Sequence, residues 1–410
     1  MRLAAITAVF AVCAGMIFAC FSPVYFYRMI RWWQWDVSDY SSIPSLEIQT
    51  STPSSQFSRN LDPLLVSTLF EKNIEVENLE KFLINTNTTS FIVIQDNTVL
   101  YESYPLGAPY KDGYHSFSVA KSFISALVGI AIDEGAIDGV DDPITKYLPE
   151  LKARDQRFQN ITIAHLLTMS SGLQYTCPYC DFGIQVPWGD NVKSLASPDL
   201  RNVLLTETHI IDDPGSHYLY KAYDPQLLSL IIERATGRPA SIYLQEKIWK
   251  PIHMEQAATW LVDSKKSGLI RGDLGINSLP IDLAKFGRLF LDQGNWDGQQ
   301  IISSDWIINS IHPGITQPEG YYPSGTEIPN LEASLFPNGD GNIYYGYLWW
   351  IASRENNSND FWALGRLGQW IYISPAKNLI IVRTGLGNGE NINITTSTWL
   401  RMFYQFASDL

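Results

Sequence analysis

The sequence predicts an α+β fold, in which one antiparallel sheet is built from both ends of a domain and a mainly helical lobe is inserted between them. Alternating apolar residues at 90–104, and strand patterns again between 344 and 384, indicate strands in two distant parts of the chain. Residues of about 140–300 show helical and loop patterns instead. Strands that flank a helical segment favour a sheet that the later part of the chain completes.

Composition excludes several classes of protein. The chain has 410 residues, of which 45% are apolar, so it can bury a large core. Its 29 Lys and Arg against 42 Asp and Glu give a net charge of −13, which argues against a nucleic-acid partner. The six His residues lack the spacing of metal ligands, and neither a P-loop nor a G-x-S-x-G motif is present. We expect no metal site.

The N-terminal segment has the features of a membrane anchor. Residues 3–27 contain no charged side chain and are numerous enough to span a bilayer. No small-residue cleavage site ends the run, and Arg28, Arg31 and three Trp residues follow it, as at a membrane interface. We expect residues 1–35 to be an N-terminal transmembrane anchor, with a signal segment and a secreted protein as the alternative.

The next segment connects the anchor to the domain. Residues 36–79 include a stretch rich in Ser and Pro, which predicts a tether or an extended wrap around the body. The domain is expected to occupy residues 80–410. Its first recognisable element is a hairpin at 90–104 with Asp96-Asn97 at the turn.

The stretch from His115 to Ile132 holds the first candidate chemistry. After Lys121 it is almost wholly apolar, without Pro, and predicts a buried helix. Ser118 and Lys121 lie one turn apart, on the same face. Burial favours a neutral lysine, which is a base for a neighbouring hydroxyl. S-x-x-K alone is weak evidence, because Ser374 also begins one in a strand-and-turn context, and a core helix with a polar start explains the spacing equally well.

The remaining elements follow in order along the chain. Residues 177–180, Cys-Pro-Tyr-Cys, lie in a predicted loop, which favours a structural disulfide or two free thiols over a redox site. Residues 311–342, rich in Pro and Gly, predict a long surface loop. Helices are expected at 161–169, 226–236, 281–293 and 395–408, and strands at 344–351, 361–364, 369–374 and 379–384.

Four motifs in this order resemble a known group of enzymes. They are Ser118-Val119-Ala120-Lys121, the segment 161–173, the segment 214–237 that contains Tyr220, and Gly365-Arg366-Leu367-Gly368-Gln369. Together they resemble the serine hydrolases related to class C β-lactamases and penicillin-binding proteins, nearest the branch of 6-aminohexanoate-dimer hydrolases and esterases. The resemblance covers roughly residues 80–405 and implies a β-lactamase/transpeptidase-like fold.

The resemblance also implies roles for individual residues. Ser118 corresponds to the nucleophile and Lys121 to its proton acceptor, and Tyr220 takes the first place of the family's Tyr-x-Asn, which relays protons. The backbone N–H groups of Ser118 and Gln369 would form the oxyanion hole. An ordinary aromatic between the lobes is the alternative for Tyr220. No metal or organic cofactor is required.

Two departures from the family motifs affect the expected substrate. Ala222 replaces the Asn of Tyr-x-Asn, and Arg366-Leu367-Gly368 stands where the family has Lys-Thr-Gly or His-x-Gly. Arg366 and Gly368 are candidate substrate-binding residues, because a guanidinium can hold a carboxylate through two hydrogen bonds. A surface charge on an edge strand is the alternative for Arg366. Both changes remove polar contacts to the substrate, which disfavours β-lactam hydrolysis.

The sequence therefore predicts a membrane-anchored serine hydrolase that forms an acyl-enzyme with a small-molecule ester or linear amide, as a carboxylesterase or amidase does. Because such enzymes are usually exported, the resemblance places the domain outside the inner membrane. A cell-wall D-alanyl peptidase and a catalytically weak penicillin-recognising binding protein are the alternatives. The sequence does not indicate an oligomeric state.

Overall fold

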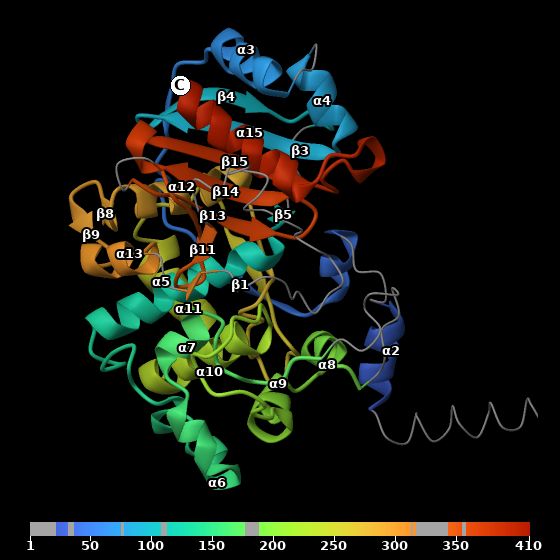
Figure 1. Cartoon of the computed structure of the whole chain (residues 1–410), viewed down its shortest axis with the longest axis vertical. Helices are drawn as coiled ribbons and strands as arrows, with labels where there is room; N and C mark the ends of the chain where they lie inside the picture. Colours follow the sequence, from blue (N-terminus) through green and yellow to red (C-terminus); the bar gives the residue numbers. More distant parts are fainter. Residues whose placement is uncertain are drawn as a thin grey trace, which may run out of the picture.

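A nine-stranded sheet forms the centre of the computed structural model, which describes residues 22–31, 37–74, 78–107, 113–176, 188–312, 315–316, 343–354 and 358–410. The strand order is β10-β11-β12-β13-β14-β15-β3-β4-β2, so β3 pairs with the late strand β15, as predicted for a sheet built from both ends (Figure 1). The strands are β2 (Ser58–Arg59), β3 (Thr88–Gln95), β4 (Thr98–Ser103), β10 (Ile315–Thr316), β11 (Ile343–Tyr345), β12 (Trp350–Ala352), β13 (Asp360–Gly365), β14 (Gln369–Ser374) and β15 (Leu379–Gly385).

The hairpin of β3 and β4 confirms the strand pattern and its turn. Asp96 and Asn97 connect the strands with φ values of 48° and 62°. Two successive positive φ values match the twist of a tight hairpin, and Asn and Asp tolerate them better than most residues. β3 is buried along nearly its whole length, because both faces of the sheet are covered.

Helices cover the two faces of this sheet in a pattern set by the alternation of side chains. On one face, Trp370 and Tyr372 of β14 contact Phe403 of the last helix. On the other face, Ile371 lies so close to Gly287 that a Cβ at 287 would clash with it. Figure 1 shows α3, α4 and α15 on the outer side of the sheet. The helices on this side are α3 (Pro63–Ile74), α4 (Leu79–Asn85) and α15 (Thr396–Asp409). The helix on the other face is α12 (Pro280–Leu291), which contains Gly287.

The predicted buried helix is α5 (Ala120–Asp133), and its side chains are buried from Ala120 to Ala131. Phe123 stacks on Phe286 with the ring centroids 3.7 Å apart. The helix packs against α10 (Tyr223–Thr236) and α11 (Ala240–Leu244). Apolar residues on every face are the physical reason why this helix lies in the core.

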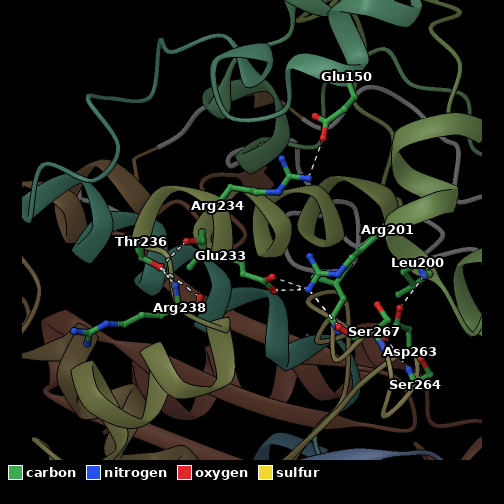
Figure 2. Close-up of polar contacts among 12 residues, drawn as sticks. Glu150, Leu200, Arg201, Glu233, Arg234, Thr236, Arg238, Asp263, Ser264 and Ser267 are labelled. Atoms are coloured by element: carbon green, nitrogen blue, oxygen red, sulfur yellow. Dashed lines mark hydrogen bonds and ion pairs between the residues drawn. The ribbon is translucent and has the colours of Figure 1, made fainter.

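The helical lobe is tied together by ion pairs on α10. Arg234 contacts Glu150 at 3.0 Å, and Arg201 contacts Glu233 at 2.7 Å (Figure 2). The lobe contains α6 (Pro149–Arg154), α7 (Ile163–Leu167), α8 (Asp190–Ala196), α9 (Leu200–Asn202), α10 and α11, and it is followed by the hairpin β8 (Asn295–Trp296) and β9 (Gln299–Gln300) and by α13 (Ser304–Ser310).

A second sheet was not expected from the sequence. It has the order β1-β6-β7-β5 and is formed by β1 (Ser45–Ile48), β6 (Ala258–Leu261), β7 (Ile276–Ser278) and β5 (Tyr114–His115). Strands of two to four residues are too short to show a period. Since β1 pairs with β6, part of the segment 36–79 lies against the domain, as in an extended wrap.

The segment 344–351, expected to be one strand, forms two. β11 and β12 pair with each other, with Tyr344 opposite Ile351. Leu348 has φ 59° in the turn between them, and a Cβ at Gly346 would clash with the carbonyl oxygen of Ser310. The expectation was wrong because contacts to a distant helix, which a local pattern does not show, reverse the chain here.

The described N-terminal part begins with α2 (Pro23–Arg31), which packs on α8. Within the described ranges, no helix has the length and apolarity needed to cross a membrane. Most of the proposed anchor, Cys177 and Cys180, and nearly all of the loop predicted at 311–342 lie outside the described residues.

Candidate active site

Ser118 lies in a short 3₁₀ turn, η2 (Phe117–Val119), directly before α5. The preceding residue, Phe117, has φ 47°, which bulky side chains rarely adopt. Its buried ring lies 4.2 Å from the ring of His115 and packs with Ile43 and Leu261. The core therefore holds an unfavourable backbone conformation immediately before Ser118, a feature that is concentrated at functional sites.

Lys121 occupies the first turn of α5 and points at Ser118. Its Nζ lies 2.9 Å from Ser118 Oγ and 2.6 Å from the backbone carbonyl oxygen of Asp273. Only 4% of Lys121 is exposed. The three-residue spacing thus places an amine against the hydroxyl, while a second acceptor orients the amine.

Tyr220 comes from the loop before α10 and joins the same site. The centroid of its ring lies 4.7 Å from Lys121 Nζ, so the amine of Lys121 faces the ring of the tyrosine. The ring of Tyr220 also stacks on the ring of Trp350, with the centroids 6.1 Å apart. It meets the ring of Tyr345 edge-on, with the centroids 6.2 Å apart. The structure therefore brings the three residues Ser118, Lys121 and Tyr220 together.

A buried ion pair next to Tyr220 was not anticipated from the sequence. Lys221 Nζ lies 2.9 Å from Ser171 Oγ and 3.6 Å from the Asp224 carboxylate, and Ser171 Oγ donates to Asp224 at 2.7 Å. Burial raises the pKa of Asp224 to about 6 and lowers the pKa of Lys221. This network anchors the backbone on the C-terminal side of Tyr220. It also explains the Ser-Ser-Gly segment, whose Ser171 supports the loop that carries Tyr220.

The motif Arg366-Leu367-Gly368 forms the turn between β13 and β14, and it lies between the strands expected at 361–364 and 369–374. Leu367 and Gly368 have φ values of 63° and 78°, which do not fit an extended strand. Arg366 is exposed, and Leu367 packs near Phe117. The neighbouring Gly365 lies against the nucleophile segment, since a Cβ there would clash with the carbonyl oxygen of Ser116.

Two buried side chains hold this turn. Gln369 Nε2 donates to the carbonyl oxygen of Gly385 at 2.7 Å, and Arg383 Nη1 donates to that of Gly368 at 2.7 Å. Arg383 also donates to the carbonyl oxygens of Thr86 and Gly387. Burial lowers the pKa of Arg383 to about 9. The turn at Arg366–Gly368 is therefore held firmly in place beside Ser118. The role of the Gln369 backbone N–H in an oxyanion hole stays a prediction.

Asp273 is a neighbour of Lys121 that sequence reasoning missed. It contacts Lys121 through its carbonyl oxygen, and its buried carboxylate accepts a hydrogen bond from Gln226 Nε2 at 2.7 Å. Burial raises the pKa of this carboxyl, opposed by the nearby charges of Lys121 and Arg271. A backbone carbonyl leaves no signal in the residue type, so no motif could have indicated the Lys121 contact.

The described residues contain no group of three or more His, Cys, Asp or Glu side chains placed to hold a metal ion. What the site does present is a hydroxyl beside an amine and a phenol, which is the composition of an activated nucleophile with proton-transfer partners.

Comparison with known proteins places this geometry in a family. The β-lactamase family model matches residues 77–391. The 6-aminohexanoate-dimer hydrolase of Paenarthrobacter ureafaciens is 28% identical over 312 residues, which is 74% of each chain. The esterase EstB of Burkholderia gladioli is 30% identical over 153 residues, which cover 33% of this chain and 36% of that protein.

Solved structures show the same fold. A provisionally named 6-aminohexanoate-dimer hydrolase from Bacillus anthracis superimposes with a TM-score of 0.69 at 21% identity, covering 90% of this chain and 91% of the other. A class C β-lactamase mutant gives a TM-score of 0.55 at 16% identity, covering 86% and 100%. The match of the family model over most of the domain, together with this fold, shows that the chain belongs to the β-lactamase family.

Proposed function

We propose that the protein is a serine hydrolase that cleaves a small-molecule ester or linear amide through an acyl-enzyme on Ser118. The observation that carries the proposal is the position of Lys121 Nζ, 2.9 Å from Ser118 Oγ and 2.6 Å from the Asp273 carbonyl oxygen. In the proposed step, a lone pair on Lys121 Nζ accepts the hydroxyl proton while an N–H bond stays directed at Asp273.

The reaction follows from these contacts in two steps. Ser118 Oγ attacks the substrate carbonyl carbon and transfers its proton to Lys121, and the resulting oxyanion binds the backbone N–H groups of Ser118 and Gln369. The carbon–oxygen or carbon–nitrogen bond to the leaving group then breaks, and Tyr220 passes a proton to that group. Lys121 passes the proton that it took from Ser118 on to the Tyr220 phenolate. A water molecule then gives a proton to Lys121 and attacks the carbonyl carbon of the acyl-enzyme ester. The bond to Ser118 Oγ breaks, and Lys121 returns the proton to Ser118 Oγ as the acid leaves.

The relatives and the two motif departures support the substrate class. The matched relatives are named as hydrolases of a 6-aminohexanoate dimer and of esters. Ala222 lacks the amide that binds a substrate's acyl amide in the resembling enzymes, and Leu367 lacks a hydroxyl. Removing such partners costs about 1–3 kcal/mol each for substrates whose polar groups become buried. Simple esters carry fewer of these groups. Arg366 and Gly368 are the proposed substrate-binding residues.

We also propose that residues 1–35 anchor the protein in the membrane, with the domain outside the inner membrane. The uncharged run at 3–21, which precedes α2 in the sequence, supports this location.

Labelling with a fluorophosphonate probe tests the proposed nucleophile. The native protein should form one covalent adduct, and Ser118→Ala should abolish it. Ser374→Ala is the matched control. Ser374 is the last residue of β14 and begins the second S-x-x-K, so this variant should leave labelling intact. An adduct that survives on Ser118→Ala would overturn the assignment. A native protein that is folded yet unlabelled would favour the weak penicillin-recognising binding protein.

A substrate comparison tests the specificity. We expect measurable hydrolysis of short-chain p-nitrophenyl esters and little hydrolysis of nitrocefin. The reason is that Ala222 and Leu367 lack the polar groups that would bind the amide of a β-lactam. The double variant Ala222→Asn, Leu367→Thr should shift the ratio toward amides and β-lactams, and kcat/KM for each substrate is the measurement. Efficient nitrocefin turnover by the native protein would contradict the proposed substrate class.

A further inference from the structure

The helix α2 has two different faces. Tyr25, Arg28 and Met29 are buried, and Tyr25 and Met29 pack with Val192 and Ala196 of α8. Val24, Tyr27 and Ile30 instead point to the surface, with exposed fractions of 48%, 65% and 57%. Their spacing of three residues puts these large apolar side chains on one side of the helix. We call these three residues the exposed stripe.

We infer that the exposed stripe lies on the surface of a phospholipid bilayer and docks the domain against the membrane. The inference rests on the membrane anchor proposed above. Residues 3–21 directly precede the helix and carry no charge. An uncharged run of about 20 residues is long enough to cross the hydrocarbon core of a bilayer. α2 then begins where the chain leaves the hydrocarbon, and its stripe is within reach of the headgroups.

The chemistry of the stripe fits that position. A Tyr between two aliphatic residues has an apolar body and a polar tip, as side chains at membrane interfaces do. Arg31 ends the helix, and its guanidinium, about half exposed, pairs with Asp39 at 2.5 Å. Pro23 has no backbone N–H, which suits the first position of a helix, so α2 starts at this residue.

The buried face of α2 makes the docking rigid. Arg28 Nη1 donates to the carbonyl oxygens of Asp263 at 2.6 Å and Ser197 at 3.2 Å. Asp263 is itself fixed, because its carboxylate accepts hydrogen bonds from the backbone N–H groups of Leu200 and Ser264 (Figure 2). A membrane contact through the stripe therefore sets the orientation of the whole domain.

The same segment leads directly to the candidate active site. After α2, Tyr40 and Ile43 pack around Phe117, the residue before Ser118, and Leu367 of the hairpin turn joins this cluster. A bilayer contact at α2 would thus fix the distance between the membrane and the cluster around Phe117, beside Ser118.

Photocrosslinking of the full chain tests the inference. The protein is reconstituted in vesicles of phosphatidylethanolamine and phosphatidylglycerol, with p-benzoylphenylalanine in place of Tyr27. The control carries the same residue in place of Leu64, which is 76% exposed on α3, well apart from α2 in Figure 1. After irradiation, mass spectrometry should find a lipid adduct at position 27 and none at position 64.

Flotation of the vesicles separates the anchor from the docking. A chain that does not float with vesicles contradicts the anchor and the docking together. A chain that floats but gives no lipid adduct at position 27, or equal adducts at 27 and 64, contradicts the docking alone. Val24→Asp with Ile30→Asp should reduce the adduct at position 27 without reducing flotation, since both side chains are exposed and the run at 3–21 is unchanged. An adduct of the same yield in this variant would also overturn the docking.

Discussion

Lys121 Nζ lies over the ring of Tyr220, and the proposed mechanism makes the two residues one proton-transfer unit. Lys121→Ala and Tyr220→Phe should each slow acylation by about 10²–10⁴-fold, and the double variant should be hardly slower than either one. Single-turnover release of p-nitrophenol measures the three rates. Tyr345→Phe, which removes a hydroxyl from the adjacent ring, is the control and should retain most activity. Free energies that add in the double-mutant cycle would refute the shared role.

His115 makes the stability of the domain sensitive to acid. Burial lowers the pKa of His115 to about 3, against about 6.5 in the unfolded chain. Between these values only the unfolded state binds the proton at His115, so the contribution of His115 to stability is complete above pH 6.5 and is lost as the pH falls toward 3. His115→Asn should reduce the slope of unfolding free energy against pH by up to about 1.4 kcal/mol per pH unit in this window.

Urea unfolding at several pH values gives that slope. Phe117→Leu, at the ring that contacts His115, is the control: it should lower stability at every pH and leave the slope unchanged. If His115→Asn has the slope of the native protein, the histidine is not the source of the acid sensitivity.

At the scale of elements, the packing of α5 against α13 depends on a glycine. A Cβ at Gly129 would clash with the indole of Trp306. Alanine favours a helix over glycine by about 1 kcal/mol, whereas overpacking a core costs about 1–3 kcal/mol. We therefore expect Gly129→Ala to be net destabilising, as measured by its urea midpoint. Gly139→Ala, where no atom lies within 4 Å of the new Cβ, should change stability by less than about 0.5 kcal/mol.

The backbone conformation of the hairpin turn at Arg366–Gly368 depends on contacts with residues that are distant in the sequence. Its strands follow from alternating side chains in β13 and β14, and these were predicted. Its conformation depends on Arg383 and Gln369, which bind backbone carbonyls of the turn and of the last residue of β15. Carbonyls are the same in every residue, so the sequence does not reveal which ones a buried guanidinium will bind.

For the molecule as a whole, the segment before residue 60 is part of the fold. β1 pairs with β6, and Ile43 packs on Phe117 beside Ser118. A chain that begins at residue 60 should therefore unfold at a lower temperature and label poorly with a fluorophosphonate. A chain that begins at residue 22 keeps α2, β1 and these contacts, and should behave like the full domain. Equal melting temperatures and labelling for the two chains would show that the segment is a simple tether.

Local patterns in the sequence by themselves determined the helix α5, the hairpin of β3 and β4, and the late strands β13 to β15. They also placed Ser118 and Lys121 on one face, because three-residue spacing is a property of any helix start. The order of four motifs indicated the family, and the comparisons confirmed it. The catalytic roles and the anchor stay predictions.

Only the tertiary structure decided the rest of the site. The carbonyl of Asp273, the pair Lys221–Asp224 and the four-stranded sheet depend on groups far apart in the chain or on backbone atoms. The strained Phe117 likewise needs its packing partners, since its residue type disfavours a positive φ. Periodicity reports what one element buries. Which distant groups meet at its ends is decided by how all the elements pack, and no local pattern contains that information.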